Sequence, residues 1–237
     1  MSLRAFFIGT GPSLRDVDLA RLEGELTFAC NRIHLHPSWK AGWRPTHYLL
    51  TDFTHNPYFL EDLTLHVGQG HSVIVTDQLL AAARKRLERE GRPAPWAWWS
   101  EPRRLTCCEH GNADDRPAEA WHKDGTICTF AGPAFQAPQI ALRELGIEEM
   151  IFLGCDLGYR PTEAGPDPNH FDETYQPGGY AAEYAHHELR NRTLRIAHQV
   201  TAVEYADRGA GTINATDGGQ LEIYKRVALE ELLPCPV

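Results

Sequence analysis

Residues 4–14 read Arg4-Ala-Phe-Phe-Ile-Gly-Thr-Gly-Pro-Ser-Leu14, and this stretch decides the fold class. The apolar run Arg4–Ile8 predicts a buried strand. Gly9-Thr-Gly-Pro-Ser13 has the composition of a tight loop, and the apolar spacing of Leu14–Leu22 predicts a helix with Ser13 at its N-cap. A buried strand that leads through a glycine loop into a helix is typical of α/β proteins that bind a ligand at the strand end.

The rest of the chain repeats this alternation of strand and helix. Further strands are predicted at Leu26–Cys30, His47–Thr51, Ser72–Thr76 and Met150–Gly154. Helices are predicted from Asp77 to Glu90, up to Gly146, and from about Ala181 to Val203, the last with Leu189, Ile196, Val200 and Val203 on one face. Near the end, Asp217-Gly218-Gly219 predicts a hairpin. We therefore expect one domain over residues 1–237, with a mostly parallel α/β sheet and helices on both faces.

Composition excludes some classes of partner. The 237 residues include 23 Lys and Arg against 32 Asp and Glu, a net charge of −9, whereas nucleic-acid binding needs a clustered positive surface. No window approaches eighteen apolar residues, so no membrane span is expected, and peripheral membrane contact and a homo-oligomer stay open. The six cysteines are irregularly spaced, which favours free thiols in a reducing compartment, and we expect a cytoplasmic protein.

The glycine loop Gly9-Thr-Gly11 predicts a contact with a phosphate or a sugar. Glycines allow the backbone to approach a ligand closely, and a helix N-terminus offers free N–H groups and a positive dipole. The P-loop lysine is absent, and Leu14 stands at the third glycine of a dinucleotide fingerprint. Asn31 follows the second predicted strand and offers both a donor and an acceptor to a base or sugar edge. The alternative is a structural turn that binds no ligand.

Residues 157–180 interrupt the alternation, because they are rich in Gly, Pro, Asp and Tyr and have little apolar periodicity. The segment follows a predicted strand end, where open α/β sheets bind their ligands. Long irregular segments at such a place are commonly lids. We therefore expect a lid at about 157–180, in which His170 is an exposed side chain.

Three motifs in order along the chain resemble two related families. The motifs are Phe7-Ile-Gly-Thr-Gly-Pro-Ser-Leu14, Phe28-Ala-Cys-Asn31 and Leu145-Gly-Ile-Glu-Glu-Met-Ile-Phe-Leu-Gly-Cys-Asp156. One family is the bacterial CMP-sialic-acid-dependent sialyltransferases that build surface glycans. The other is the MptE-like family, named for an archaeal 6-hydroxymethyl-dihydropterin diphosphokinase, which Pro168-Asn-His-Phe171 and Asn214-Ala-Thr-Asp-Gly-Gly219 also resemble.

The resemblance implies a Rossmann-like sheet with a lid that holds a donor nucleotide across the strand ends. The residues implied to contact the donor are Gly9, Thr10, Gly11, Ser13, Asn31, Asp52, Thr129, Tyr159 and Tyr175. This chain departs from the sialyltransferases at Thr10, where they have Asn, and at Thr129-Phe-Ala-Gly132, where they have a Thr-Ser-Gly stretch.

Glycosyl transfer needs a base for the acceptor hydroxyl, and a histidine suits that role because its pKa lies near neutral pH. We predict His170 as the base, with His186 and His187 as alternatives and Arg190 as a phosphate contact. Asp156 is the second predicted catalytic residue, where it would bind a ribose hydroxyl, hold a metal or orient a histidine.

A separate group, Cys107, Cys108, His110 and His122, has enough ligands for zinc but not a standard spacing, so zinc binding there stays open.

The first interpretation of function is a CMP-sugar-dependent glycosyltransferase, which needs no cofactor and acts on a glycan or small-molecule acceptor in surface glycan biosynthesis. One alternative is an ATP- and Mg²⁺-dependent diphosphokinase of the MptE type acting on a pterin-type alcohol. Asp52 and Asp156, at neighbouring strand ends, would help to bind the Mg²⁺ in that enzyme. The third interpretation, from a different class, is a nucleotide-binding protein without turnover.

Overall fold

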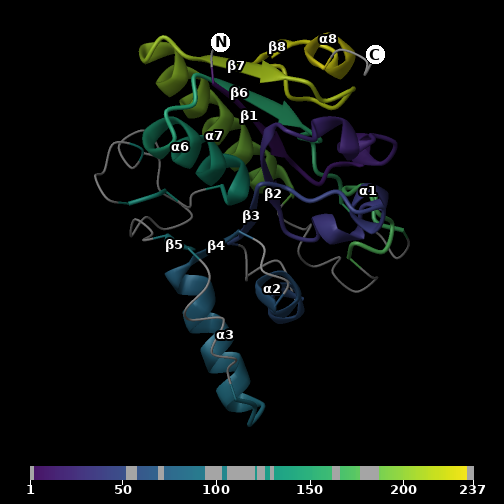
Figure 1. Cartoon of the computed structure of the whole chain (residues 1–237), viewed down its shortest axis with the longest axis vertical. Helices are drawn as coiled ribbons and strands as arrows, with labels where there is room; N and C mark the ends of the chain where they lie inside the picture. The colour runs from purple at the N-terminus through teal and green to yellow at the C-terminus, as the bar shows by residue number, and fades with distance from the viewer. Residues whose placement is uncertain are drawn as a thin grey trace.

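A single parallel sheet organises the chain in the computed structural model, which describes residues 3–51, 58–68, 72–93, 103–105, 121, 126–128, 131–161, 166–176 and 187–233. In these residues eight strands pair in the order β5-β4-β3-β2-β1-β6-β7-β8, and all seven pairings are parallel (Figure 1). The strands are β1 Arg4–Ile8, β2 Leu26–Cys30, β3 His47–Leu50, β4 Val73–Thr76, β5 Arg103–Leu105, β6 Glu149–Leu153, β7 Gly211–Asn214 and β8 Lys225–Arg226. The fold is therefore α/β and Rossmann-like, as the sequence predicts.

Helices and short 3₁₀ turns connect the strands. The α-helices of the described residues are α1 Pro37–Lys40, α2 Phe59–Gly68, α3 Asp77–Arg89, α6 Pro133–Glu144, α7 His187–Asp207 and α8 Leu229–Leu232. Three 3₁₀ turns, η1 Pro12–Leu14, η2 Leu19–Leu22 and η3 Ile33–Leu35, lie in the first part of the chain. Thr76 caps α3, because its hydroxyl accepts a hydrogen bond from the Leu79 N–H at 3.1 Å.

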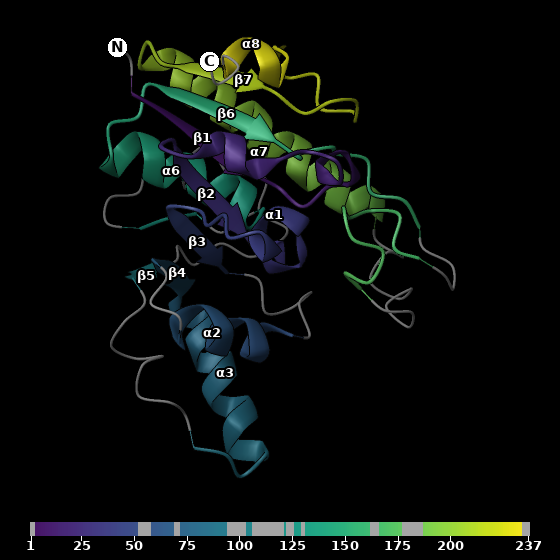
Figure 2. The same cartoon turned by 45° about the vertical axis from the view of Figure 1, so that its right-hand side comes forward.

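Two apolar cores lie on opposite faces of the sheet, because successive side chains of a strand point to opposite faces. On β1, Ala5 and Phe7 pack into the core under α6 and α7. Phe6 and Ile8 pack into the other core, which includes residues of α1, α2, α3 and α8. Figures 1 and 2 show α6 and α7 lying side by side along the sheet, with α2 and α3 grouped at its β4 end. Burial on both faces explains why the central strands are continuous apolar runs.

The carboxyl ends of the central strands meet at one edge of the sheet, because the strands are parallel. Ile8 pairs with Ala29 of β2 on one side and with Leu153 of β6 on the other. The loops that follow β1, β2, β3 and β6 therefore begin at neighbouring positions.

The predicted strands Arg4–Ile8 and Leu26–Cys30 are confirmed. His47–Thr51 and Ser72–Thr76 differ from the structure by one residue at one end, and Met150–Gly154 by one residue at each end. The predicted helix Leu14–Leu22 is wrong, since the structure has only η1 and η2 there. Asp18 interrupts the segment with an extended backbone and caps η2 by accepting the Ala20 N–H at 3.0 Å.

The predicted hairpin at Asp217-Gly218-Gly219 is also wrong. β7 and β8 are parallel, with Ile213 opposite Lys225. The chain between them curls around the guanidinium of Arg226, which donates hydrogen bonds to the carbonyl oxygens of Thr216 and Gly218 at 2.8 and 2.6 Å. This loop returns the chain to the edge of the sheet where β7 begins, and β8 therefore runs in the same direction as β7.

The buried face of the long helix α7 matches the predicted one only in part, because Val200 packs against the core as predicted but Leu189 and Val203 do not. Leu189 and Val203 are 58% and 57% exposed, while the buried residues are Ala197, His198, Thr201, Glu204 and Tyr205. Polar side chains can lie on the buried face because they find partners there. Thr201 donates to the Ala197 carbonyl oxygen, and His198 is hydrogen-bonded to the Tyr224 hydroxyl at 2.9 Å.

Among the described helices, none combines the length and apolarity that crossing a bilayer requires. Cys30, Cys128 and Cys155 are buried.

Candidate functional site

The loops after β1 and β6 lie directly against each other. The Gly9 N–H donates to the Leu153 carbonyl oxygen at 2.8 Å, and the Gly11 N–H donates to that of Gly154 at 2.9 Å. A Cβ on Gly9 would lie well within 3.0 Å of the Gly154 carbonyl oxygen, and a Cβ on Gly11 within 3.0 Å of the Asp156 carboxylate. Close packing of two backbones therefore requires these glycines, whether or not a phosphate also approaches them.

Gly9→Ala should destabilise the chain by about 1–3 kcal/mol, because the obstructing atom is the Gly154 carbonyl oxygen, which is held by its hydrogen bond from the Gly11 N–H. Gly211→Ala is the matched control, since the nearest atom to its Cβ is 4.0 Å away. That substitution should change stability by less than about 1 kcal/mol, in the stabilising direction. Urea unfolding of both variants measures the difference, and equal stabilities would contradict the packing argument.

Asp156 and Ser13 join the two loops across 143 positions of sequence. The Ser13 hydroxyl donates to one oxygen of the Asp156 carboxylate at 2.7 Å, and its N–H donates to the other at 3.2 Å. Burial raises the pKa of Asp156, and the hydrogen bonds from Ser13 oppose that rise. Ser13 is thus not the N-cap of a helix as the sequence predicts, and Gly11 holds the N-cap position of η1 without a side-chain bond.

The loop before β8 also packs on Asp156. The Gln220 N–H donates to the Asp156 carbonyl oxygen, and a Cβ on Gly219 would lie within 3.0 Å of that same oxygen. Asp156 therefore connects three segments of the chain at the strand ends. The predicted catalytic role of Asp156 stays a prediction beside this structural one.

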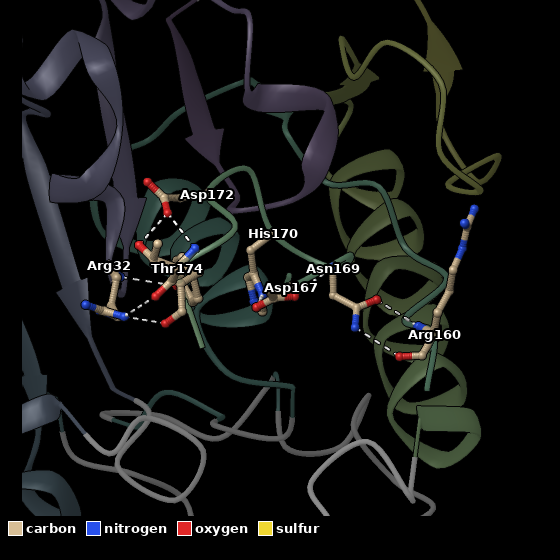
Figure 3. Close-up of polar contacts among 8 residues, drawn as sticks. Arg32, Arg160, Asp167, Asn169, His170, Asp172 and Thr174 are labelled. Carbon is tan, nitrogen blue, oxygen red and sulfur yellow. Dashed lines mark hydrogen bonds and ion pairs between the residues drawn. The ribbon is translucent and has the colours of Figure 1, made fainter. Parts of the chain in front are cut away.

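His170 is buried, with 4% of its surface exposed, so the expectation of an exposed lid histidine is wrong. Its Nδ1 lies 2.7 Å from a carboxylate oxygen of Asp167, which is itself only 2% exposed (Figure 3). The ring of Tyr175 stacks on the imidazole, with centroids 3.9 Å apart and planes at 4°. Aromatic and polar contacts, and not the apolar face of a helix, hold the segment around His170 in place. This explains why the segment has no apolar periodicity.

The surroundings of His170 favour its neutral form. Burial is the main cause that lowers its pKa from the usual value, and the nearby charges of Arg190 and Arg32 lower it further. The carboxylate of Asp167 acts in the opposite direction, through the hydrogen bond and its charge. A neutral imidazole in such a place has one ring nitrogen able to accept a proton.

The predicted lid segment is anchored to the loops after β1 and β2. The Phe171 N–H donates to the Thr10 carbonyl oxygen at 3.1 Å, and the Arg32 N–H donates to the Tyr175 hydroxyl at 3.2 Å. The Arg32 guanidinium donates to the Thr174 and Tyr175 carbonyl oxygens (Figure 3). Burial raises the pKa of Tyr175 well above its usual value, so its phenol is a neutral hydrogen-bonding group.

Tyr159 reaches the same place from the loop after β6. Its backbone N–H donates to the Asn191 amide oxygen at 2.7 Å, and the Asn191 amide donates back to the Tyr159 carbonyl oxygen at 2.9 Å. The Tyr159 ring lies 6.1 Å from that of His170, and the Arg190 guanidinium lies 4.6 Å above the Tyr159 ring. The structure thus brings Tyr159, Tyr175, His170 and Arg190 together, as their joint role in the predicted site requires.

At neighbouring strand ends, polar atoms of two residues are buried and have no hydrogen-bond partner among the described residues. They are the amide oxygen of Asn31 and the hydroxyl of Thr51. Asn31 also has a left-handed backbone, with φ at 50°, and its carbonyl oxygen accepts a hydrogen bond from the Tyr48 hydroxyl. A buried polar atom without a partner costs about 1–3 kcal/mol, which a ligand at this edge would recover. We call His170, Tyr175, Tyr159, Asn31 and Thr51 the strand-end site.

Several predicted residues lie outside the described part of the chain. They are Asp52, Thr129, His186 and the four candidate zinc ligands Cys107, Cys108, His110 and His122. His187 is described and begins α7. Among the described residues no group of three or more His, Cys, Asp or Glu side chains is arranged to hold a metal ion.

Sequence reasoning missed Asp167 and Arg32. Asp167 precedes His170 by three positions, a spacing that allows contact in a tight turn and was the available signal. Arg32 is a single arginine after a strand, and nothing in the sequence distinguishes it from a solvated side chain. Its position is fixed by residues more than 140 places further along the chain.

Comparison with solved structures finds the same fold in several sialyltransferases. CstII from Campylobacter jejuni in complex with the substrate analogue CMP-3FNeuAc superposes with a TM-score of 0.52 and 13% identity, over 96% of this chain and 86% of that one. CST-II in complex with a trisaccharide acceptor and CMP gives a TM-score of 0.54 and 13% identity, over 99% and 89% of the two chains. The α-2,3-sialyltransferase Cst-I from Campylobacter jejuni gives 0.50 and 13%, over 94% and 79%.

No protein-family model matches the chain, and no curated protein sequence matches it. At such low identities the likeness establishes the shared fold.

Proposed function

We propose that the chain is a glycosyltransferase that uses a CMP-sugar donor, organised as one domain with residues 157–180 as its lid. The observation that carries the proposal is the buried pair of His170 and Asp167 at the strand-end site. A neutral imidazole held between a carboxylate and an aromatic ring is suited to general-base catalysis. The unpartnered polar atoms of Asn31 and Thr51, on neighbouring strand ends, supply contacts for a nucleotide.

The proposed reaction assigns one proton transfer to His170. Its Nε2 accepts the proton of the acceptor hydroxyl while the hydroxyl oxygen forms a bond to the anomeric carbon of the donor sugar. The bond between that carbon and the phosphate oxygen breaks, and CMP departs with the electron pair. Base assistance of this kind contributes about 10²–10⁴-fold to a rate.

Charge and hydrogen bonding near His170 suit the departing phosphate. The Arg32 and Arg190 guanidinium groups both act electrostatically on His170, so positive charge lies close to the reacting groups. Tyr175 remains a neutral phenol that can donate a hydrogen bond. These groups stabilise a leaving phosphate without a divalent ion, and we therefore propose that the enzyme needs no metal cofactor.

The choice of donor follows the structural neighbours. One of them was solved in complex with CMP and a trisaccharide acceptor, and another with a CMP-sugar analogue. By that analogy the acceptor is a glycan, and we propose a role in surface glycan biosynthesis.

CMP should bind and stabilise the folded chain, by about 2.7 kcal/mol at a hundred times its Kd. Asn31→Asp should remove most of this shift, because a carboxylate replaces the buried amide next to an anionic ligand, while the left-handed backbone is retained. Thermal unfolding with CMP, UDP, GDP and ATP measures the preference. If none of these nucleotides shifts the transition at millimolar concentration, the proposed function is wrong.

Assays of product release distinguish the proposed glycosyltransferase from the two alternative functions. CMP release from CMP-sialic acid should continue in EDTA and should increase with a trisaccharide acceptor. The diphosphokinase alternative would instead release AMP from ATP with the pterin alcohol, and only with Mg²⁺. Binding of nucleotide with no turnover in either assay would favour the non-catalytic interpretation.

A further inference from the structure

The carboxylate of Asp167 is fixed at both of its oxygens. One oxygen accepts the Asn169 backbone N–H at 2.8 Å, which forms a tight turn within the lid segment. The other lies 2.7 Å from Nδ1 of His170. The Asp167 N–H donates to the Glu173 carbonyl oxygen at 3.2 Å, so the backbone beneath the carboxylate is held as well. The turn therefore leaves the second carboxylate oxygen directed at the imidazole (Figure 3).

A carboxylate oxygen can only accept a hydrogen bond, so this contact requires the proton of a neutral His170 to be on Nδ1. Nε2 then has the lone pair. Among the described residues Nε2 has no hydrogen bond, and the stacked ring of Tyr175 fixes the plane in which it lies. Both the tautomer and the orientation of the ring are thus set by neighbours.

We propose that Asp167 is the positioning residue of the strand-end site, which keeps His170 in the Nδ1–H tautomer and so presents Nε2 as the proton acceptor. The catalytic part of this inference rests on the proposed function, whereas the tautomer does not.

The groups that face His170 give the proposal a second measurable consequence. Burial, with Tyr175 and Tyr159 against the ring, lowers the pKa of His170, and the charges of Arg190 from α7 and Arg32 from the loop after β2 lower it further. Asp167 is the group that raises it. Loss of the Asp167 charge should therefore lower the pKa of His170 further.

The test compares Asp167→Asn with Asp172→Asn. Asp172 provides a matched control in the same segment, because its carboxylate accepts the Thr174 N–H and hydroxyl at 2.7 and 2.6 Å in a similar turn but has no hydrogen bond to a histidine among the described residues. Nitrogen-15 NMR of the imidazole, followed over pH, reports the tautomer and the pKa of His170 in each protein. We expect the Nδ1–H tautomer in the wild type and in Asp172→Asn, and a mixed or inverted tautomer with a lowered pKa in Asp167→Asn.

Kinetics then tests the catalytic part. Asp167→Asn should lower kcat for transfer by about 10²-fold or more with little change in the KM for the CMP-sugar, and should move the acid limb of the pH profile downward. Asp172→Asn should leave both unchanged.

If the wild-type protein has the Nε2–H tautomer, the proposal is wrong. This test needs no variant, so it remains decisive even if Asp167→Asn does not fold. An unchanged tautomer and pKa in a folded Asp167→Asn protein also overturn it. If the chain transfers no sugar at all, the proposed function fails, and the NMR result still decides the positioning role.

Discussion

Lowering the pH from 7 to 4 should reduce the free energy of unfolding by about 6 kcal/mol, because two histidines are buried as neutral imidazoles. Burial, with the charges of Arg32 and Lys40, lowers the pKa of His34 to about 4. Burial alone lowers the pKa of His198 to about 3. Each contributes about 3 kcal/mol at pH 4 relative to an unfolded pKa near 6.5.

The free energy of unfolding falls at low pH because the unfolded chain binds more protons than the folded chain. Below pH 6.5 both imidazoles take up a proton in the unfolded chain, while in the folded chain they stay neutral until about pH 4 and pH 3. The unfolded state then binds more protons, so stability falls with pH through this window. Since domains of this kind are stable by about 5–15 kcal/mol, acid unfolding should begin near pH 4.

The slope of unfolding free energy against pH isolates the histidine contribution. His198→Asn keeps a polar group near the Tyr224 hydroxyl and removes the titration, so its slope between pH 6.5 and 4 should fall by about one proton, roughly 1.4 kcal/mol per pH unit. Identical slopes in the wild type and His198→Asn would refute the assignment.

His170→Gln should lower the rate of sugar transfer by about 10²–10⁴-fold, the usual contribution of a general base. Glutamine retains a polar group beside Asp167 and avoids the buried, unpaired carboxylate that alanine would leave. Binding of CMP should persist, because the imidazole is proposed to act on the acceptor. Steady-state CMP release, with thermal shift by CMP on the same samples, separates the two effects.

His36→Gln is the matched control for this prediction. His36 is also buried and packs against the same segment, with its ring 5.1 Å from that of Phe171, and its Nε2 lies 2.9 Å from the Leu14 carbonyl oxygen. It makes no described contact with Asp167 or Tyr175, so its loss should leave most of the activity. Comparable rate losses in both variants would mean that packing of the segment, and not a base, limits the rate.

The strands could be predicted because their signal is local. Arg4–Ile8 and Leu26–Cys30 are apolar runs between turn residues, and the pattern alone gives their ends. The failures have a shared cause in distant contacts. Ser13 caps no helix because its hydroxyl binds Asp156, and β8 runs parallel to β7 because Arg226 holds the intervening loop.

Part of the candidate site could likewise be predicted from the sequence, and part of it could not. Histidine and tyrosines in an irregular segment after a strand could be identified from composition and place, and the structure brings His170, Tyr159 and Tyr175 together. Their burial could not be predicted, because it depends on anchors in loops far away, such as the Phe171 contact with Thr10. The partnership of Asp167 with His170 depends on the geometry of one turn.

The place of β1 at the centre of the sheet also determines how the chain must assemble during synthesis. β1 is synthesised before the other strands of this sheet and can pair with β2 soon afterwards, but its other edge stays unpaired until β6 has been made. At roughly 5–20 residues per second, the ribosome needs roughly 7–30 s to make the intervening chain. During that time the nascent protein has an open apolar strand edge, which is a template for aggregation. The N-terminal half alone should therefore need a chaperone that the finished chain does not.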